Sequence, residues 1–111
     1  MSYEVRTIQP FEREAEKLAR KYPSLKNDLA QLVESLESNP KQGTPLGENF
    51  YKIRLAIKSK GKGKSGGARV ITFVLVVQKK LFLSSIYDKS DKENITDKEL
   101  KHLVKIISSQ L

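Results

Sequence analysis

Two neighbouring segments rich in β-branched and aromatic residues constrain the fold of this chain most strongly. Residues 68–77 (ARVITFVLVV) and 81–88 (LFLSSIYD) are separated only by Gln78, Lys79 and Lys80. Val, Ile and Phe favour extended backbone over helix, and a connection this short joins strands that run antiparallel. The sequence therefore predicts a β-hairpin in the second half of the chain.

Two more strands are predicted ahead of this hairpin. In residues 50–57, the apolar side chains at positions 51, 53, 55 and 57 alternate with a second set that contains Lys52 and Arg54. This alternation is the period of a half-buried strand. Residues 2–9 carry β-branched residues in rough alternation, so we expect a short strand there. Residues 41–49 are rich in turn formers and are expected to form a loop.

Three helices are predicted from apolar positions that repeat every three to four residues. The first begins at Pro10 and ends before Pro23, because proline disfavours helix at the residue before it. Ser24 is expected to cap the second helix, and Thr96 with Glu99 forms the capping-box pattern that opens the third. The first two helices are joined so tightly that they should pack as a hairpin.

The order of elements is thus β-α-α-β-β-β-α. Consecutive strands with short links form an antiparallel meander, so we expect an α+β fold in which a small antiparallel sheet packs against the N-terminal helical hairpin. With 111 residues, the chain is expected to form a single domain over residues 1–111.

Positive charge is concentrated in one segment. The net charge is +8, yet no acidic residue occurs between Glu48 and Asp88, a stretch that we call the acid-free interval. Because the excess charge belongs to this interval, a polyanionic partner is expected for it. The interval holds nine of the 21 basic residues: Lys52, Arg54, Lys58, Lys60, Lys62, Lys64, Arg69, Lys79 and Lys80.

Several classes of protein are disfavoured by the composition. The chain has no cysteine, so disulfides and thiolate metal sites are excluded. No signal peptide is evident and no apolar run is long enough to span a bilayer, which favours a cytoplasmic protein without a membrane partner. The single histidine, His102, lies off the apolar stripe of its helix, so no metal and no other cofactor is expected.

The glycine- and lysine-rich residues 58–67 (KSKGKGKSGG), which we call the basic loop, resemble half of a phosphate-binding loop. Gly63, Lys64 and Ser65 match the end of that motif, but Lys58 stands where its first glycine belongs. A strand follows in place of the required helix, so the sequence argues against a nucleotide site. Two interpretations remain: a solvated hairpin loop, or a cationic arm above neighbouring strands.

The ordered set of segments YKIRL, GGARVI and IYDKSDKENIT, with KYPSLKNDL in the helical hairpin, resembles the RelE/ParE superfamily of bacterial type II toxins. The resemblance covers nearly the whole chain and is greatest to the HigB-like and RelE-like members. It implies a toxin that cleaves mRNA in the ribosomal A site, next to ribosomal RNA, and that a cognate antitoxin protein silences.

The resemblance also implies roles for individual residues. Lys52 and Arg54 match the basic pair on the second strand of the RelE-like nucleases, Arg69 matches the arginine that opens the third, and Lys89 matches a basic residue after the last strand. The catalytic tyrosine of the family has no direct counterpart, because a gapless comparison places Ile95 there and the nearest phenol is Tyr87.

We hypothesise a metal-independent reaction in which the 2′-hydroxyl of the RNA attacks the adjacent phosphate. Arg69, assisted by Arg54, suits the phosphoryl oxygens because a guanidinium contacts two of them at once. Lys52 is the candidate for one proton transfer, and Tyr87 or Lys89 for the other. The residues expected to bind RNA around this site are Lys58, Lys60, Lys62, Lys64 and Lys92.

Two other features bear on this hypothesis. Phe50 shares the strand face of Lys52 and Arg54, where an RNA base can stack on it. Residues 88–94 (DKSDKEN), which include Asp88, are interpreted as a solvated turn of mixed charge.

Two alternative functions remain open. A ParE-like inhibitor of DNA gyrase has the same fold, although such proteins typically lack the clustered basic residues of the central strands. A non-catalytic RNA-binding module is the second alternative. Cleavage of mRNA distinguishes both alternatives from the nuclease.

Overall fold

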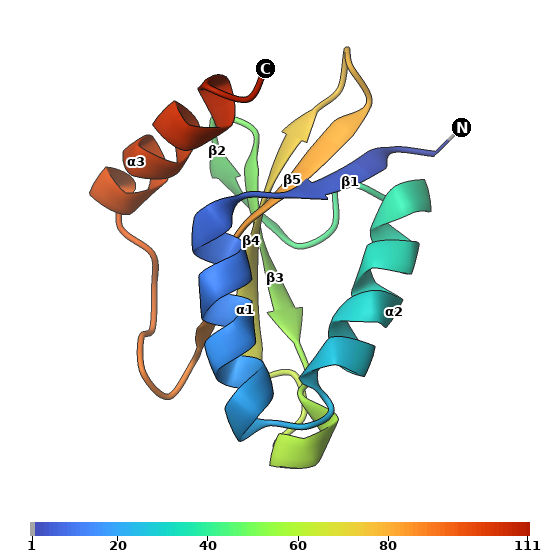
Figure 1. Ribbon diagram of the computed structural model, residues 1–111, viewed down its shortest axis with the longest axis vertical. Coiled ribbons are helices and arrows are strands. Elements are labelled where there is room, and N and C mark those ends of the chain that lie inside the picture. Colours follow the sequence, from blue (N-terminus) through green and yellow to red (C-terminus); the bar gives the residue numbers. More distant parts are fainter. Residues whose placement is uncertain (1) are drawn as a thin grey trace.

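The computed structural model describes residues 2–111, which form an α+β fold with one mixed five-stranded sheet and three α-helices (Figure 1). The elements in chain order are β1 (Glu4–Thr7), α1 (Gln9–Lys21), α2 (Leu25–Ser38), β2 (Thr44–Gly47), β3 (Phe50–Leu55), the short 3₁₀ helix η1 (Lys58–Lys60), β4 (Ala68–Leu75), β5 (Lys80–Asp88) and α3 (Asp97–Ser108). The predicted fold class is confirmed. No helix among residues 2–111 combines the length and the apolar character that crossing a membrane requires.

The strands lie in the order β1-β5-β4-β3-β2. β3, β4 and β5 form the predicted antiparallel meander. β1 differs from the prediction, because it pairs parallel with β5 at the edge of the sheet. Two strands that pair in parallel need a long connection between them. The helical hairpin α1–α2 lies between β1 and the other strands in sequence, so β1 can reach the edge of the sheet beside β5.

The segment 41–49 also differs from the prediction, since Thr44–Gly47 forms the edge strand β2. It pairs antiparallel with β3, and Glu48 and Asn49 make the turn with positive φ angles of 52° and 72°. Positive φ at both central residues is the geometry of the tightest hairpins. Pro45 is tolerated because an edge strand needs hydrogen bonds on one side only.

The ends of the helices follow the sequence signals in two cases of three. α1 ends before Pro23, and the Thr96 hydroxyl accepts from the Glu99 N–H at 3.1 Å in a complete capping box. Ser24 occupies the N-cap position of α2 but has helical backbone angles, and its hydroxyl makes no cap hydrogen bond. That hydroxyl donates to Asp28 Oδ2 at 2.8 Å and accepts from the Ser59 N–H at 2.8 Å. The predicted cap bond at Ser24 is therefore wrong, because the basic loop occupies the hydroxyl.

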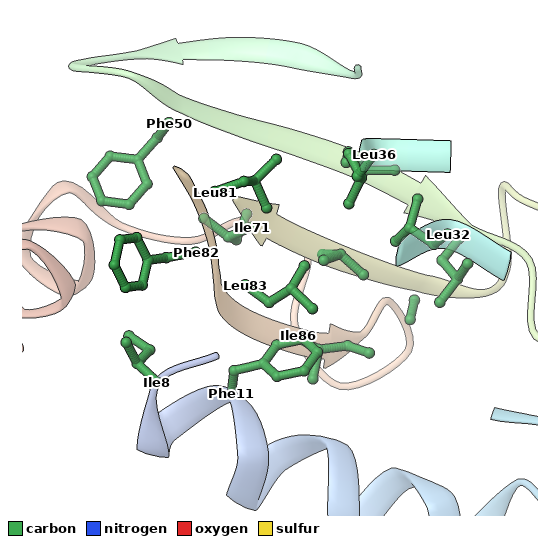
Figure 2. Packing of buried hydrophobic residues seen from close by; sticks show 14 of the residues in the cluster. Ile8, Phe11, Leu32, Leu36, Phe50, Ile71, Leu81, Phe82, Leu83 and Ile86 are labelled. Atoms are coloured by element: carbon green, nitrogen blue, oxygen red, sulfur yellow. The ribbon is translucent and has the colours of Figure 1, made fainter. Parts of the chain in front are cut away.

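Buried side chains of the strands and all three helices form one core. Figure 2 shows part of it, where side chains of the central strands meet those of α1 and α2. Phe50 is fully buried in it and its ring packs edge-to-face on Phe73, with ring centroids 5.0 Å apart. Leu100, Leu103 and Ile107 of α3 join the same cluster. The expectation that an RNA base stacks on Phe50 is therefore wrong, because the ring has no exposed face.

Candidate nucleic-acid interface

The strand register aligns three of the predicted site residues across the middle of the sheet. Arg54 of β3 lies opposite Arg69 of β4, and Arg69 lies opposite Tyr87 of β5. Residues directly opposite each other share a face of the sheet, so we call these three residues the cross-strand row. Lys52 lies two residues before Arg54 and therefore on the same face. Four of the five residues that the sequence assigned to catalysis thus come from three strands onto one face.

Arg54 and Lys52 are the accessible cations of this group. Arg54 is exposed, and Lys52 is half-buried with its Nζ donating to Asn94 Oδ1 at 3.2 Å. Asn94 belongs to the segment between β5 and α3, so this bond connects β3 to that segment. Both side chains keep donors that a phosphate can use, because a guanidinium has five N–H groups and an ammonium three.

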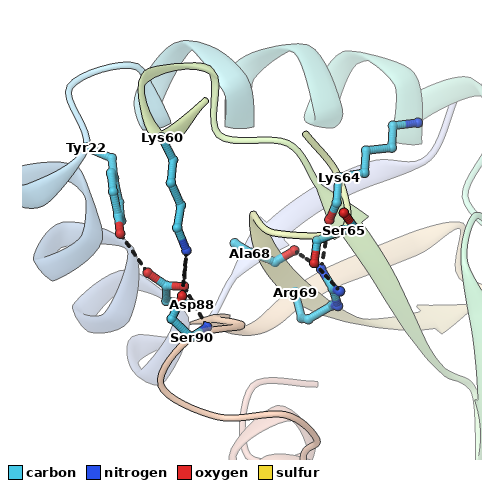
Figure 3. Close-up of polar contacts among 8 residues, drawn as sticks. All are labelled: Tyr22, Lys60, Lys64, Ser65, Ala68, Arg69, Asp88 and Ser90. Atoms are coloured by element: carbon cyan, nitrogen blue, oxygen red, sulfur yellow. Dashed lines mark hydrogen bonds and ion pairs between the residues drawn. The ribbon is translucent and has the colours of Figure 1, made fainter. Parts of the chain in front are cut away.

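Arg69 is buried, with 4% of its surface exposed, and its guanidinium contacts the basic loop (Figure 3). Nη1 donates to the carbonyl oxygens of Lys64 at 3.0 Å and Ala68 at 3.1 Å, and Nη2 donates to that of Ser65 at 3.1 Å. The sequence interpretation placed this guanidinium on the scissile phosphate. In the structure it holds the end of the basic loop against β4.

Tyr87, the last member of the cross-strand row, is also buried, with 6% of its surface exposed. Its hydroxyl lies near the backbone of Ile95 but has no well-formed hydrogen bond within the described residues. Lys92 Nζ lies 5.1 Å from the centre of its ring. Burial raises the pKa of the phenol above its ordinary value of 10.0, so at neutral pH the group is a proton donor and not a base.

Lys89 follows β5 directly and is exposed. Its backbone N–H donates to the carbonyl oxygen of Gly67 at 3.1 Å. The end of the basic loop and the start of the segment after β5 therefore lie side by side, which brings Lys89 close to the loop.

The five lysines that were predicted to bind RNA fall into two groups. Lys58, Lys62 and Lys64 are exposed on the basic loop. Lys92 forms an ion pair with Glu99 and its side chain stays 30% exposed, whereas Lys60 forms a buried ion pair and presents no free ammonium to solvent. The expectation that Lys60 binds RNA is therefore wrong, whereas that for Lys92 stays a prediction.

The partner of Lys60 is Asp88, which the sequence analysis placed in a solvated turn. Lys60 Nζ lies 2.5 Å from Asp88 Oδ1, and the exposed fractions of the two side chains are 8% and 0%. Tyr22 Oη donates to Asp88 Oδ2 at 2.9 Å and the Ser90 N–H donates to Oδ1 at 2.9 Å (Figure 3). Burial opposes ionisation of Asp88, but the hydrogen bonds from Lys60, Ser90 and Tyr22 outweigh it and lower its pKa from 3.8 to about 2.

A cleft of about 520 Å³ lies between α2 and the outer edge of β3. Lys58 and Lys64 of the basic loop line it together with Arg54, and Gln31 and Ser35 contribute from α2. The exposed cations of β3 and of the loop therefore meet at one hollow of the surface. Among residues 2–111, no three side chains of His, Asp or Glu come together as metal ligands.

Comparison with known proteins identifies relatives of the chain. Residues 9–111 match the family described as "RelE toxin of RelE / RelB toxin-antitoxin system". The fold is similar to that of a mutant of the E. coli toxin RelE in the free state, with a TM-score of 0.63 and 17% identity over 95% of this chain and 97% of that one. It is also similar to the isolated E. coli RelE toxin, with a TM-score of 0.61 and 16% identity over 95% of this chain and 99% of that one.

Proposed function

This chain belongs to the RelE toxin family, and from that membership we propose that it inhibits translation by cleaving mRNA in the ribosomal A site. The family implies a cognate antitoxin as its partner. The observation that supports cleavage is the cross-strand row with Lys52 beside it, because two guanidinium groups, an amine and a phenol on one face can act on a single phosphodiester. In this proposal the ribosome presents the mRNA strand to that face.

The proposed reaction needs three groups around one phosphate. A base takes the proton of the 2′-hydroxyl while the 2′-oxygen bonds to phosphorus. Cations stabilise the charge that develops on the phosphoryl oxygens, and an acid protonates the 5′-oxygen as the P–O5′ bond breaks. The products are a 2′,3′-cyclic phosphate and a 5′-hydroxyl, which balances atoms and protons without an added reactant.

Arg54 is the proposed first contact of the phosphate, since it is the exposed member of the row. Arg69 reaches the same phosphate only after its bonds to the carbonyls of Lys64 and Ser65 are exchanged for bonds to RNA. A charged acceptor forms stronger hydrogen bonds with a guanidinium than a neutral carbonyl does, so phosphate can compete for these donors.

The proton transfers are assigned to the groups that flank these arginines. Lys52 is proposed as the base at the 2′-oxygen, a role that its neutral amine can perform and its ammonium cannot. Tyr87 keeps its proton at neutral pH because burial raises its pKa, so we place it at the leaving 5′-oxygen. The phenol becomes accessible to RNA only when Lys92 and the segment around Ile95 move away from it. Lys89, which is exposed, is the alternative acid.

The burial of Arg69 and Tyr87 favours one competing function, a non-catalytic RNA-binding module. In that case only Arg54 and the lysines of the basic loop hold RNA, and the phosphodiester stays intact. Salt dependence of binding does not separate the two functions, because both proteins release counterions from RNA.

The test measures cleavage of a defined mRNA on translating ribosomes, with mapping of the 5′ ends. We expect wild-type protein to leave 5′-hydroxyl ends and Arg54→Ala to lower the cleavage rate about 100-fold or more, as loss of a transition-state contact does. Arg20→Ala is the matched control, because Arg20 is an exposed arginine on α1 that pairs with Glu16. It should cleave at the wild-type rate.

Intact mRNA in the presence of folded wild-type protein would contradict the nuclease. RNA binding without cleavage would then support the non-catalytic module, and DNA breaks that depend on gyrase would support the gyrase inhibitor.

A further inference from the structure

The carboxylate of Asp88 connects three segments that are far apart in the sequence. It accepts hydrogen bonds from Tyr22 at the end of α1, from Lys60 in the basic loop and from the N–H of Ser90 after β5. Lys60 also donates to Ser90 Oγ at 2.9 Å, and its Nζ lies 5.6 Å from the centre of the Tyr22 ring. One fully buried anion thus fixes where the basic loop begins.

Stability alone is a weak reason for such an arrangement. Removing two charges from water is unfavourable, and a buried ion pair often contributes no more to stability than apolar residues of the same size would. Its best-supported advantage is to fix one geometry among several. Asp88 is the first acidic residue after the acid-free interval, and its carboxylate forms an ion pair with one buried lysine of that interval, Lys60.

The basic loop is held at further points beyond Lys60. The N–H of Lys58 donates to Asp28 Oδ2 at 3.1 Å, and the Ser59 hydroxyl lies 2.9 Å from that of Ser24. At the other end, Arg69 binds the carbonyls of Lys64 and Ser65. In the protein without RNA, the loop is therefore anchored on both sides of its tip.

The exposed lysines of the loop lie between or beside these anchors. Lys58 and Lys64 reach the cleft that Arg54 also lines, and Lys62 lies at the exposed tip. A loop held in place loses less conformational entropy when it binds RNA than a mobile arm does, and its charges already stand at fixed separations.

We propose that Asp88 is a positioning residue for RNA binding, which fixes the basic loop through Lys60 so that Lys58, Lys62 and Lys64 form a preorganised cationic clamp beside Arg54. This inference rests on the proposed function, because it assigns RNA to the same interface. Asp88 itself does not contact RNA.

The test compares Asp88→Asn with Asp91→Asn. Asp91 lies three residues further along, is exposed and has no ion pair within the described residues, so both variants add one unit of positive net charge. If charge alone governed binding, both variants would bind RNA more tightly. We expect Asp91→Asn to bind a single-stranded RNA oligonucleotide at least as tightly as wild type and Asp88→Asn to bind it about 10-fold more weakly.

Limited trypsin digestion measures how accessible and mobile the basic loop is in the absence of RNA. We expect cleavage after the loop lysines to be at least 10-fold faster in Asp88→Asn than in Asp91→Asn, under conditions in which circular dichroism shows both variants folded. On ribosomes, Asp88→Asn should raise the ribosome concentration for half-maximal cleavage and leave the maximal rate close to that of wild type. A folded Asp88→Asn with the RNA affinity and the trypsin resistance of Asp91→Asn would overturn the proposal.

If Asp88→Asn does not fold, Lys60→Gln replaces it, with Lys62→Gln as its matched control. Lys60 is buried whereas Lys62 is exposed, so direct contact with RNA predicts the larger loss for Lys62→Gln. Positioning predicts the larger loss of affinity for Lys60→Gln, and the reverse order overturns it. Should wild-type protein neither bind nor cleave RNA, the proposed function fails, and the trypsin comparison still decides whether Asp88 positions the loop.

Discussion

At the scale of single residues, two tyrosine hydroxyls differ in whether they have a hydrogen-bond partner. Tyr22 donates to Asp88, whereas the hydroxyl of Tyr87 lies buried without a well-formed hydrogen bond. A buried hydroxyl without a partner lowers stability, so it persists where something other than stability requires it. The proposed role of Tyr87 as proton donor supplies such a requirement.

Removal of this hydroxyl should therefore separate stability from activity. We expect Tyr87→Phe to keep or raise the free energy of unfolding, by up to about 1 kcal/mol, because no hydrogen bond is lost. Cleavage of mRNA should fall about 100-fold, as for loss of a general acid. Urea unfolding and the ribosome assay measure the two effects. Tyr22→Phe is the control and should lose about 1 kcal/mol of stability; full activity in Tyr87→Phe would transfer the acid role to Lys89.

The lowered pKa of Asp88 predicts how stability depends on pH. Its pKa falls from 3.8 to about 2 on folding, so its contribution is complete above pH 4 and is lost as the pH falls through about 2. We expect wild type to exceed Asp88→Asn by on the order of 1–2 kcal/mol at pH 6. Urea unfolding at pH 6, 4, 3 and 2 should show this difference shrink only below pH 4. A difference that stays constant down to pH 2 would show that the carboxylate titrates normally in the folded protein.

Single residues also show what strand alternation can and cannot reveal. Alternation placed Phe50, Lys52 and Arg54 on one face, and the register with β4 agrees, since Phe50 lies opposite Phe73 and Arg54 opposite Arg69. It carried no information on what covers that face. Phe50 is fully buried in the core that α3 joins, whereas Arg54 stays exposed, because the burial of each depends on contacts that are distant in sequence.

At the scale of elements, the sequence located segments that carry their own signal and missed those that depend on a neighbour. The α3 capping box is complete within four residues and was predicted. β2 carries Pro and Gly and becomes a strand only because β3 pairs with it. The anchoring of the basic loop could not be predicted either, because its partners Tyr22, Asp28 and Asp88 belong to other elements.

Gly67 ends the basic loop where β3 and β4 approach each other closely. A Cβ there would lie 2.0 Å from the carbonyl oxygen of Leu55 and 3.1 Å from the N of Ile57, so the backbone would have to move. We expect Gly67→Ala to lose about 2–4 kcal/mol of stability. Gly63→Ala, at a φ of +65° but in open space, should lose only about 1 kcal/mol. Thermal unfolding of both variants tests this order, and equal losses would contradict the close approach at Gly67.

The capping box makes a separate prediction for α3. Thr96→Ala removes the acceptor for the Glu99 N–H and should lower the free energy of unfolding by about 1 kcal/mol. Thr96→Ser should restore most of that loss, because serine keeps the hydroxyl. Ser108→Ala, at the other end of the same helix, is the control and should change little. Chemical denaturation of the three variants gives the comparison, and a loss in Ser108→Ala as large as that in Thr96→Ala would exclude a specific cap effect.

At the scale of the whole molecule, the acid-free interval does not form one uniform positive surface. Lys79 and Lys80 lie at the β4–β5 turn, whereas the basic loop lies at the opposite end of these strands (Figure 1). Lys60 is neutralised by Asp88 inside the protein. The cations that gather at one cleft are those of β3 together with Lys58 and Lys64 of the basic loop. The net charge of the interval therefore overstates the number of cations available at the interface.

The position of the lysines predicts which of them govern the salt dependence of RNA binding. Each phosphate contact on a single strand contributes about −0.7 to the slope of log affinity against log salt concentration. Replacing both Lys62 and Lys64 by Gln should therefore make the slope shallower by about 1.4.

The control replaces Lys17 of α1 and Lys105 of α3 by Gln, which removes the same charge from exposed positions outside the interval. Fluorescence anisotropy with a single-stranded RNA oligonucleotide between 50 and 300 mM salt should leave the control slope unchanged. Equal changes in the two double variants would mean that RNA responds to total charge, and the clamp of the basic loop would then have no part in binding.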